Sequence, residues 1–166
     1  MGKTAIATRL AREIEAVHLR IDSIEQALRR CNITILGPEG YVVAYAIAED
    51  NLGVGRIVIA DSVNPVELTR AEWRRVAQRA GKRYIDVEIV CSDQVEHRRR
   101  AESRLADIAG QTLPTWQQVR DREYEPWEAS IVLDTSGQHP GASVSELLSM
   151  LEPLIREDRD IGNAGK

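Results

Sequence analysis

The most informative stretch for the fold is IVIADSVNP, residues 57–65. Its first four residues form an unbroken apolar run, which is typical of a parallel strand buried on both faces. Asn64 is suited to cap a helix, Pro65 suits a first helical turn, and Glu67 completes the spacing of a capping box. The stretch therefore predicts a buried strand followed directly by a helix.

The predicted helix after this strand has its own apolar spacing and its own stop signal. Leu68, Val76 and Ala80 can mark its buried side. Gly81 is suited to end it, because glycine readily adopts the left-handed conformation found just past helix ends. We therefore expect a helix that ends at Gly81.

The same alternation extends in both directions along the chain. Strands are predicted over residues 17–20, 84–91 and 130–135. Helices are predicted over residues 4–15, 23–30 and 41–51, from a cap at Asp93 to about Ala109, after a cap at Thr115, and from Ser143 onward. Strands that alternate with helices in this way indicate an α/β fold whose parallel sheet is covered on both faces.

Length, composition and charge narrow the class of protein. The 166 residues predict one domain over residues 1–157 and a flexible polar tail over residues 158–166. Phe is absent, so the core must be built from Ile, Val, Leu and Ala. The net charge of −4 argues against nucleic acid as a partner, although locally clustered Arg residues leave a small anion possible.

The cysteines and the N-terminus predict a cytoplasmic protein. Cys31 and Cys91 lie far apart and form no CxxC pair, so we expect reduced thiols rather than a disulfide framework or a metal site. No apolar run approaches the roughly 20 residues that a membrane helix needs, so no membrane association is expected. The N-terminus lacks the apolar region of a signal peptide.

The tripeptide Gly2-Lys3-Thr4 matches the last three positions of a phosphate-binding loop, G-x-x-x-x-G-K-[ST]. An amphipathic helix follows at once, as expected where a helix binds phosphate at its N-terminus. In that setting Lys3 would reach the β- and γ-phosphates, and the Thr4 hydroxyl would bind Mg²⁺. The alternative is an ordinary N-terminal helix with a solvated Lys, which the tripeptide alone does not exclude.

Two aspartates end predicted strands. Asp61 closes IVIAD in the form of a Walker-B strand, whose carboxylate lies beside Mg²⁺ at the edge of the sheet. Asp22 follows the strand over residues 17–20 and could accept the proton of a substrate hydroxyl. Either aspartate could instead cap a helix or lie in a loop, and the local pattern favours neither interpretation.

The block HRRRAESR places Arg98, Arg99, Arg100 and Arg104 within two helical turns. Arg100 and Arg104 are neighbours on one helix face, so their guanidinium groups could clamp transferring phosphates. The alternative is a solvated basic face balanced by nearby Glu residues. His18, His97 and His139 show no metal-ligand spacing and are interpreted as incidental.

Six blocks occur in order along the chain: GKT, IDSIEQAL, IVIADSVNPVELTRAEW, VEIVCSDQVEHRRRAESR, PTWQQVRDREYEPW and IVLDTSG. Together they resemble the small P-loop kinases often labelled AAA-family ATPases. That group is similar to gluconate kinase, chloramphenicol phosphotransferase and zeta-toxin kinases. The resemblance covers residues 2–155, nearly the whole chain.

The resemblance implies a three-layer P-loop NTPase fold of the nucleoside-kinase type. It implies a kinase that uses ATP and Mg²⁺ and transfers the γ-phosphoryl group to a hydroxyl of an unidentified small molecule. Gly2, Lys3 and Thr4 match the end of the Walker-A loop. Asp61 matches the Walker-B aspartate, a metal ligand, and Asp22 matches an acidic residue that binds substrate or acts as general base.

The resemblance also implies a lid, here residues 94–112, whose arginines close over the triphosphate. Arg100 and Arg104 are the arginines we expect to act in catalysis, and Arg98 is expected to contact ATP.

The chain departs from this family at its start. A family member carries a further strand and a glycine-rich turn before the position of Gly2. That strand lies centrally, between the strands that correspond to residues 56–61 and 84–91, so its absence leaves two strand edges facing an empty slot. Three explanations are open: a misassigned start codon, a degenerate inactive product, or direct pairing of these two strands in a non-catalytic binding remnant.

Overall fold

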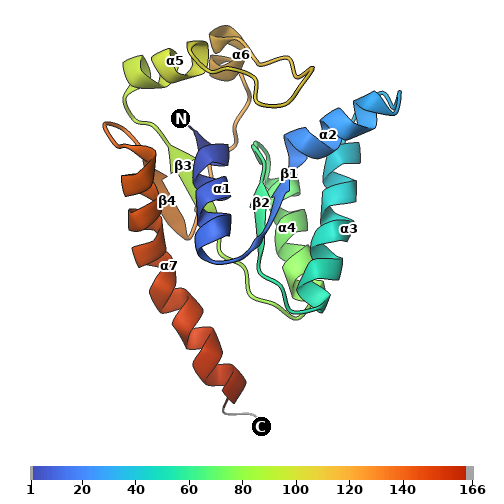
Figure 1. Cartoon of the computed structure of the whole chain (residues 1–166), viewed down its shortest axis with the longest axis vertical. Helices are drawn as coiled ribbons and strands as arrows, with labels where there is room; N and C mark the ends of the chain where they lie inside the picture. The colour runs from blue at the N-terminus through green and yellow to red at the C-terminus, as the bar shows by residue number, and fades with distance from the viewer. Residues whose placement is uncertain (1, 164–166) are drawn as a thin grey trace.

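The computed structural model describes residues 2–163, with side chains through Ile155. Within this part of the chain, four short strands alternate with helices in this order: α1 Lys3–Glu13, β1 Val17–Arg20, α2 Ile21–Arg30, α3 Glu39–Gly53, β2 Val58–Asp61, α4 Glu67–Arg79, β3 Val87–Val90, α5 Gln94–Glu102, α6 Trp116–Arg120, β4 Ile131–Asp134 and α7 Pro140–Asn163. The expected α/β class, with parallel strands and intervening helices, is confirmed (Figure 1). No helix among the described residues is both long enough and apolar enough to cross a membrane.

The strands form two separate parallel pairs rather than one continuous sheet. β1 pairs with β2, with Leu19 opposite Ala60, and β3 pairs with β4, with Ile89 opposite Leu133. No hydrogen-bonded ladder joins β2 to β3. Direct pairing of these two strands is therefore contradicted, and the discontinuity lies where the family resemblance places a central strand. We call the space between β2 and β3 the slot.

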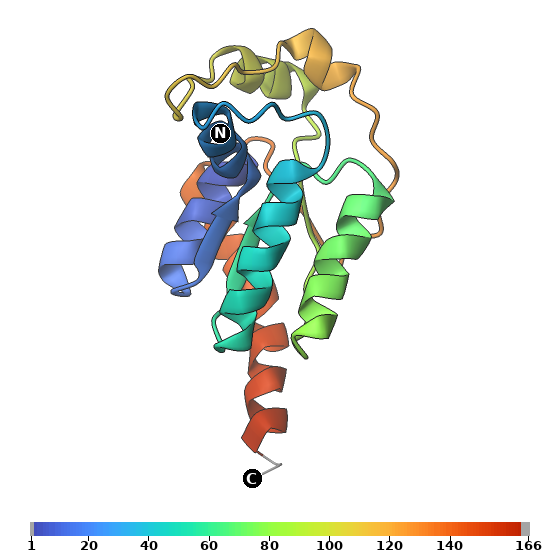
Figure 2. The same ribbon diagram turned by 90° about the vertical axis from the view of Figure 1, so that its right-hand side faces the viewer.

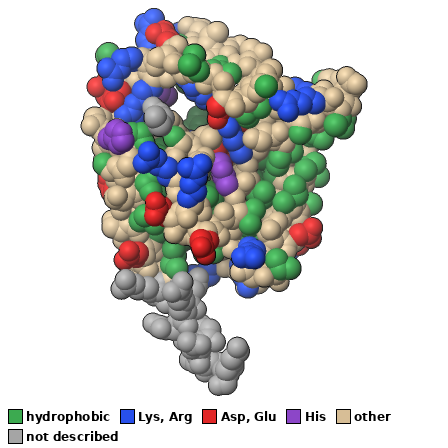
Figure 3. All heavy atoms as spheres, viewed as in Figure 1, with side chains coloured by type: hydrophobic (Ala, Val, Ile, Leu, Met, Phe, Trp, Pro, Cys, Tyr) green, Lys and Arg blue, Asp and Glu red, His purple; other side chains and the backbone are tan. Residues whose placement is uncertain are grey.

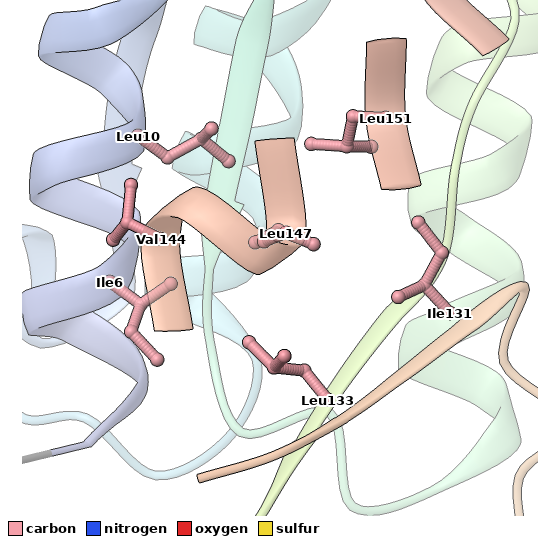
Figure 4. Close-up of a cluster of buried hydrophobic side chains, with 7 residues drawn as sticks. All are labelled: Ile6, Leu10, Ile131, Leu133, Val144, Leu147 and Leu151. Atoms are coloured by element: carbon pink, nitrogen blue, oxygen red, sulfur yellow. The ribbon is translucent and has the colours of Figure 1, made fainter. Parts of the chain in front are cut away.

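Two apolar cores hold the strand pairs (Figures 1 and 2). The larger core joins α1, β4 and α7 through seven buried side chains, shown in Figure 4: Ile6, Leu10, Ile131, Leu133, Val144, Leu147 and Leu151. The smaller core joins β1, α3 and α4 through Leu19, Ala48 and Val76. Because α1 packs on α7 in the larger core and contacts β1 and β2, its N-terminus is fixed near the ends of those strands.

The slot explains why β2 is less buried than its sequence predicts. A strand buried on both faces was expected over residues 57–60, yet Ile57 is 46% exposed, Ala60 is exposed, and Val58 and Ile59 are half-buried. Side chains of β2 and β3 both line one large cavity. The prediction of full burial was wrong because the edge of β2 that faces away from β1 has no neighbouring strand.

The turn after β2 also differs from its prediction. Asn64 does not cap the next helix, because it has a left-handed backbone (φ 48°) and its side chain accepts a hydrogen bond from the Ser62 hydroxyl. Helix α4 begins at Glu67, whose N–H donates to a Glu125 carboxylate oxygen at 2.6 Å. The carboxylate of a distant residue thus takes the place of the predicted local cap.

Helix boundaries were predicted unevenly. Val76 is buried and Gly81 follows the end of α4 with φ 63°, as expected, but Leu68 is 70% exposed, so its predicted burial was wrong. The caps at Asp93 and Thr115 are confirmed, each with its side chain accepting from backbone N–H groups.

Three other helix boundaries differ from their predictions. Helix α5 stops at Glu102 instead of Ala109, because the following segment packs against α2 through polar contacts. Helix α7 starts at Pro140, and Ser143 is buried with its hydroxyl donating to the Gln138 side chain. The backbone of residues 158–163, which were expected to be a flexible tail, continues α7, and residues 164–166 lie outside the described part.

Candidate functional site

The N-terminus of α1 and the carboxyl ends of the strands meet beneath residues 94–112, the segment expected to be a lid, for which we keep that name (Figure 1). They enclose one side of a cavity of about 1920 Å³, and the surface is hollowed below the lid in Figure 3. All but one of the predicted site residues line this cavity: Gly2, Lys3, Thr4, Asp22, Asp61, Arg100 and Arg104. The side chain of Arg98 is instead 61% exposed and donates to Glu102 at 2.9 Å.

Asp61 is the centre of the most tightly organised group in this cavity. Its side chain is 1% exposed, and it accepts hydrogen bonds from Lys3 Nζ and from Thr4. Its other carboxylate oxygen pairs with His18 Nε2. The distance from Asp61 Oδ1 to Lys3 Nζ and the distance from Asp61 Oδ2 to His18 Nε2 are both 3.2 Å. Since an ionised carboxylate can only accept, Nε2 of His18 carries the proton that is shared. Three elements, α1, β1 and β2, thus converge on one carboxylate.

The environment of Asp61 keeps its carboxylate ionised. Burial opposes ionisation, but the hydrogen bond from His18, the charge of Lys3 and the hydrogen bonds from Thr4 and Lys3 outweigh it and lower the pKa of Asp61 to about 2. The site therefore holds a negative charge at any physiological pH, although that charge is largely compensated by Lys3.

This lowered pKa predicts an acid-sensitive contribution to stability. Because the folded-state pKa lies below the ordinary value of about 3.9, the contribution is complete above that value and is lost as the pH falls towards 2. Its size is about 2 kcal/mol. Urea unfolding of the wild type and of Asp61→Asn at pH 5, 4, 3 and 2.5 measures it. We expect the unfolding free energy of Asp61→Asn to fall less steeply with acid, and parallel curves would contradict the assignment.

A second charged group lies where β1 turns into α2. Arg20 is the last residue of β1. Its Nη1 and Nη2 donate hydrogen bonds to the two carboxylate oxygens of Asp107, at 2.6 and 2.8 Å. Arg20 Nη2 also lies 3.8 Å from Asp22 Oδ2. Asp22 was expected to end the strand or to cap a helix starting at Ser23, but it is the second residue of α2, and its side chain is 39% exposed. This arrangement places a carboxylate and a guanidinium side by side at the cavity.

The lid arginines have different surroundings. Arg100 donates to the Thr135 hydroxyl at 2.9 Å, to the Thr135 carbonyl at 2.8 Å and to Glu96 at 2.7 Å, so its guanidinium fastens α5 to the loop after β4. Arg104 is exposed at the cavity and lies near enough to Asp107 to lower the pKa of that carboxyl. In this conformation, Arg104 is better placed than Arg100 to meet a bound anion.

The loop after β4 is organised by Asp134. Its carboxylate accepts from the backbone N–H groups and hydroxyls of Ser92 and Ser136. These hydrogen bonds hold the pKa of Asp134 well below its usual range. Together with the contacts of Arg100, they fix the ends of β3 and β4 beneath the lid.

Sequence reasoning missed His18 and Arg20. His18 was interpreted as incidental and Arg20 was not singled out, yet both contact predicted site residues. The alternation in VHLR could have placed both residues. Leu19 packs in the smaller core, so His18 and Arg20 point to the opposite face of the strand pair. Asp61, which lies opposite Arg20 on β2, has its side chain on that same face. Alternation along a four-residue strand was enough to place them, once the partner strand was known.

Comparisons with known proteins add nothing to this geometry. No protein-family model matches the chain, and a search of curated proteins gives no significant match.

The site combines features that suit a magnesium-bound polyphosphate. The N-terminus of α1, an 11-residue helix, presents backbone N–H groups with no side-chain cap, and Lys3 adds a cation there. Asp61 and Thr4 offer a carboxylate and a hydroxyl in contact, the hard oxygen ligands that Mg²⁺ prefers. No group of three or more His, Cys, Asp or Glu suited to a metal occurs among the described residues.

Proposed function

We propose that this protein is an ATP-dependent kinase with a P-loop NTPase fold, which transfers the γ-phosphoryl group of ATP to a hydroxyl of a small molecule. The observation that carries the proposal is the meeting of Lys3, Thr4 and Asp61 at the N-terminus of α1, beside the carboxyl ends of parallel strands. In open α/β sheets this edge is where ligands bind. The lid arginine Arg104 and the carboxylate of Asp22 line the same cavity.

Each residue has one role in the transfer. The α1 N–H groups and Lys3 bind the phosphates, and Lys3 exchanges its contact with Asp61 for a phosphate oxygen. The acceptor oxygen forms a bond to the γ-phosphorus while the bond from that phosphorus to the bridging oxygen breaks and ADP leaves. Asp22 takes the proton of the acceptor hydroxyl. Arg104 stabilises the charge on the phosphoryl oxygens.

Asp61 and Thr4 are the residues that would hold Mg²⁺. When bound there, the ion neutralises the developing charge on the phosphates. His18 and Lys3 keep the Asp61 carboxylate ionised before the ion arrives.

The slot belongs to the same proposal. Apolar side chains of β2 and β3 face one cavity, and no ladder joins the two strands. We propose that one further parallel strand fills the slot, supplied by a segment that precedes Gly2 and leads through a glycine-rich turn into α1. Such a turn would add backbone N–H groups around the phosphates. The DNA upstream of Met1 offers a direct check: an in-frame apolar run followed by G-x-x-x-x is expected, and an immediate stop codon favours a non-catalytic remnant.

Substitutions in the chain carrying that upstream segment test the proposal. ATP affinity is measured by equilibrium titration with Mg²⁺ and again with a chelator. Lys3→Ala is expected to weaken binding by roughly tenfold or more in both conditions, because a phosphate contact is lost. Asp61→Asn is expected to weaken it only with Mg²⁺ present, because its role is to hold the ion.

The matched control for these variants is Arg75→Ala. It removes a cation whose partner, Glu72, lies on an exposed face of α4 away from the cavity, so it should leave ATP affinity unchanged. If all three variants bind ATP as the wild type does, the assignment of this site to nucleotide is wrong. If the longer chain itself folds but binds no ATP, the non-catalytic alternative takes its place.

A further inference from the structure

Arg20 has an unusual set of partners for a residue at the edge of a cavity. Its side chain is 12% exposed, and the two terminal nitrogens of its guanidinium are held by Asp107. Its Nε is buried and has no hydrogen-bond partner among the described residues. A buried donor without a partner carries a free-energy cost, so its retention calls for an explanation.

The carboxylate that holds Arg20 is carried by an irregular segment. Residues 103–115 contain no helix or strand, and the side chain of Asp107 is 58% exposed. The same segment contacts α2 through side-chain hydrogen bonds from Gln26 and Arg30 to the Ala109 carbonyl. A counter-ion on such a segment can leave the guanidinium without disturbing either core.

The geometry of the contact is that of ligand recognition. Two parallel N–H···O hydrogen bonds from a guanidinium fit the two oxygens of a carboxylate, and equally those of a phosphate. Arg20 also lies beside Asp22, the residue that takes the proton of the acceptor hydroxyl in the proposed function. An anionic group bound at Arg20 would therefore place a neighbouring hydroxyl of the same molecule close to Asp22.

We propose that Arg20 is the acceptor-binding residue of this site and that Asp107 occupies it as a stand-in when no acceptor is bound. The acceptor is then a hydroxylated small molecule that carries a carboxylate or a phosphate group. This inference rests on the proposed function for the role of Asp22, but anion binding at Arg20 does not depend on ATP.

The charges around Arg20 support an exchange of one anion for another. Asp107, Asp22 and, at greater distance, Asp61 each favour the charged form of the guanidinium. An arriving anion must therefore displace Asp107, because Asp22 and Asp61 are held in regular elements whereas Asp107 is not. Asp107 should thus compete directly with the acceptor.

The test uses the 166-residue chain and three small probes: glycerate, glycerol 3-phosphate and glycerol. Binding is measured by calorimetric titration in the wild type and in every variant. Where Arg20 is present, binding is also followed by NMR through the Arg20 Nε–H resonance, which reports on this guanidinium and not on the α1 site. We expect a saturable shift with at least one of the two anions and none with glycerol. The two anionic arms distinguish a carboxylate-bearing from a phosphate-bearing acceptor.

Three variants make the outcome decisive. Asp107→Asn, at an exposed position, should tighten binding of the anion by about fivefold or more, because it removes the competing charge. Arg20→Gln should abolish binding, and Lys3→Ala should leave it intact. The proposal is overturned if neither anion shifts the resonance in the wild type or in Asp107→Asn, if glycerol acts equally, or if Lys3→Ala abolishes binding while Arg20→Gln does not. A failure of ATP binding alone would leave these anion titrations unchanged.

Discussion

Arg70→Met is expected to lower the free energy of unfolding by about 3–4 kcal/mol. The side chain of Arg70 is almost completely buried, at 1% exposure, yet the structure shows no carboxylate paired with it among the described residues. It donates instead to four backbone carbonyls, those of Asn64, Pro65, Glu125 and Pro126. Methionine fills a similar volume but removes the donors to these carbonyls, of which the Pro65 carbonyl keeps a hydrogen bond from the Glu125 backbone N–H.

The aromatic neighbours of Arg70 add to this effect. Its guanidinium carbon lies 5.0 Å from the ring centre of Tyr124 and 4.9 Å from that of Trp127. Both contacts are cation–π interactions, which strengthen when the cation is desolvated. Arg70 therefore ties the loop after Asp61 to the segment around Glu125 and Pro126, together with the hydrogen bonds that Glu125 makes to Pro65 and Glu67.

Urea unfolding provides the measurement, with Arg75→Met as the matched control. Arg75 is exposed on the same helix, so its substitution should cost less than about 0.5 kcal/mol. Arg70→Lys is expected to recover less than half of the loss, because one ammonium cannot reach four carbonyls around two rings. Equal stabilities of the Arg70→Met and Arg75→Met variants would contradict this account of the buried guanidinium.

The second large effect is expected from filling the slot. In a chain extended by the proposed upstream strand, amide exchange within β2 and β3 should slow by about a hundredfold or more, because edges that lack a ladder in the present structure gain one. Exposed apolar side chains such as Ile57 should become buried, which stabilises by about 1.5–3 kcal/mol for each side chain fully removed from water.

Hydrogen exchange followed by mass spectrometry reads this out segment by segment. The matched control is an extension of equal length in which two strand residues are replaced by Pro, which cannot complete a ladder. Exchange in α3, which lies on the far side of the smaller core, should change little in either chain. Unchanged exchange of β2 and β3 in the extended chain would show that the slot does not take a strand.

The elements were predictable where local signals agree with packing. VHLR and IVLD were recognised as strands, and the caps at Asp93 and Thr115 were found, because apolar alternation and cap chemistry act within a few residues. The start of α4 was missed because its first N–H is bonded by Glu125, far along the chain. No local pattern encodes a partner of that kind.

The residues of the candidate site were likewise predictable only where a local motif names them. Lys3, Thr4 and Asp61 were named from motif letters, and the structure brings them into contact. His18 and Arg20 were not found, because their roles depend on which strand lies beside β1 and on how the lid segment docks. Arg98 and Arg104 come from the same sequence block, but Arg98 lies in α5 and pairs with Glu102, whereas Arg104 follows the end of α5 and lies at the cavity. The expected sharing of one helix face by Arg100 and Arg104 was therefore wrong.

The most direct test of the central claim is a calorimetric titration of Mg-ATP into two chains, the one described here and the same chain extended by the proposed strand and glycine-rich turn. The proposed function predicts saturable one-to-one binding by the extended chain and binding weaker by roughly tenfold or more in the shorter one, which lacks the added N–H groups. Absence of binding heat in an extended chain that folds cooperatively would contradict the claim that this site is built for a nucleotide.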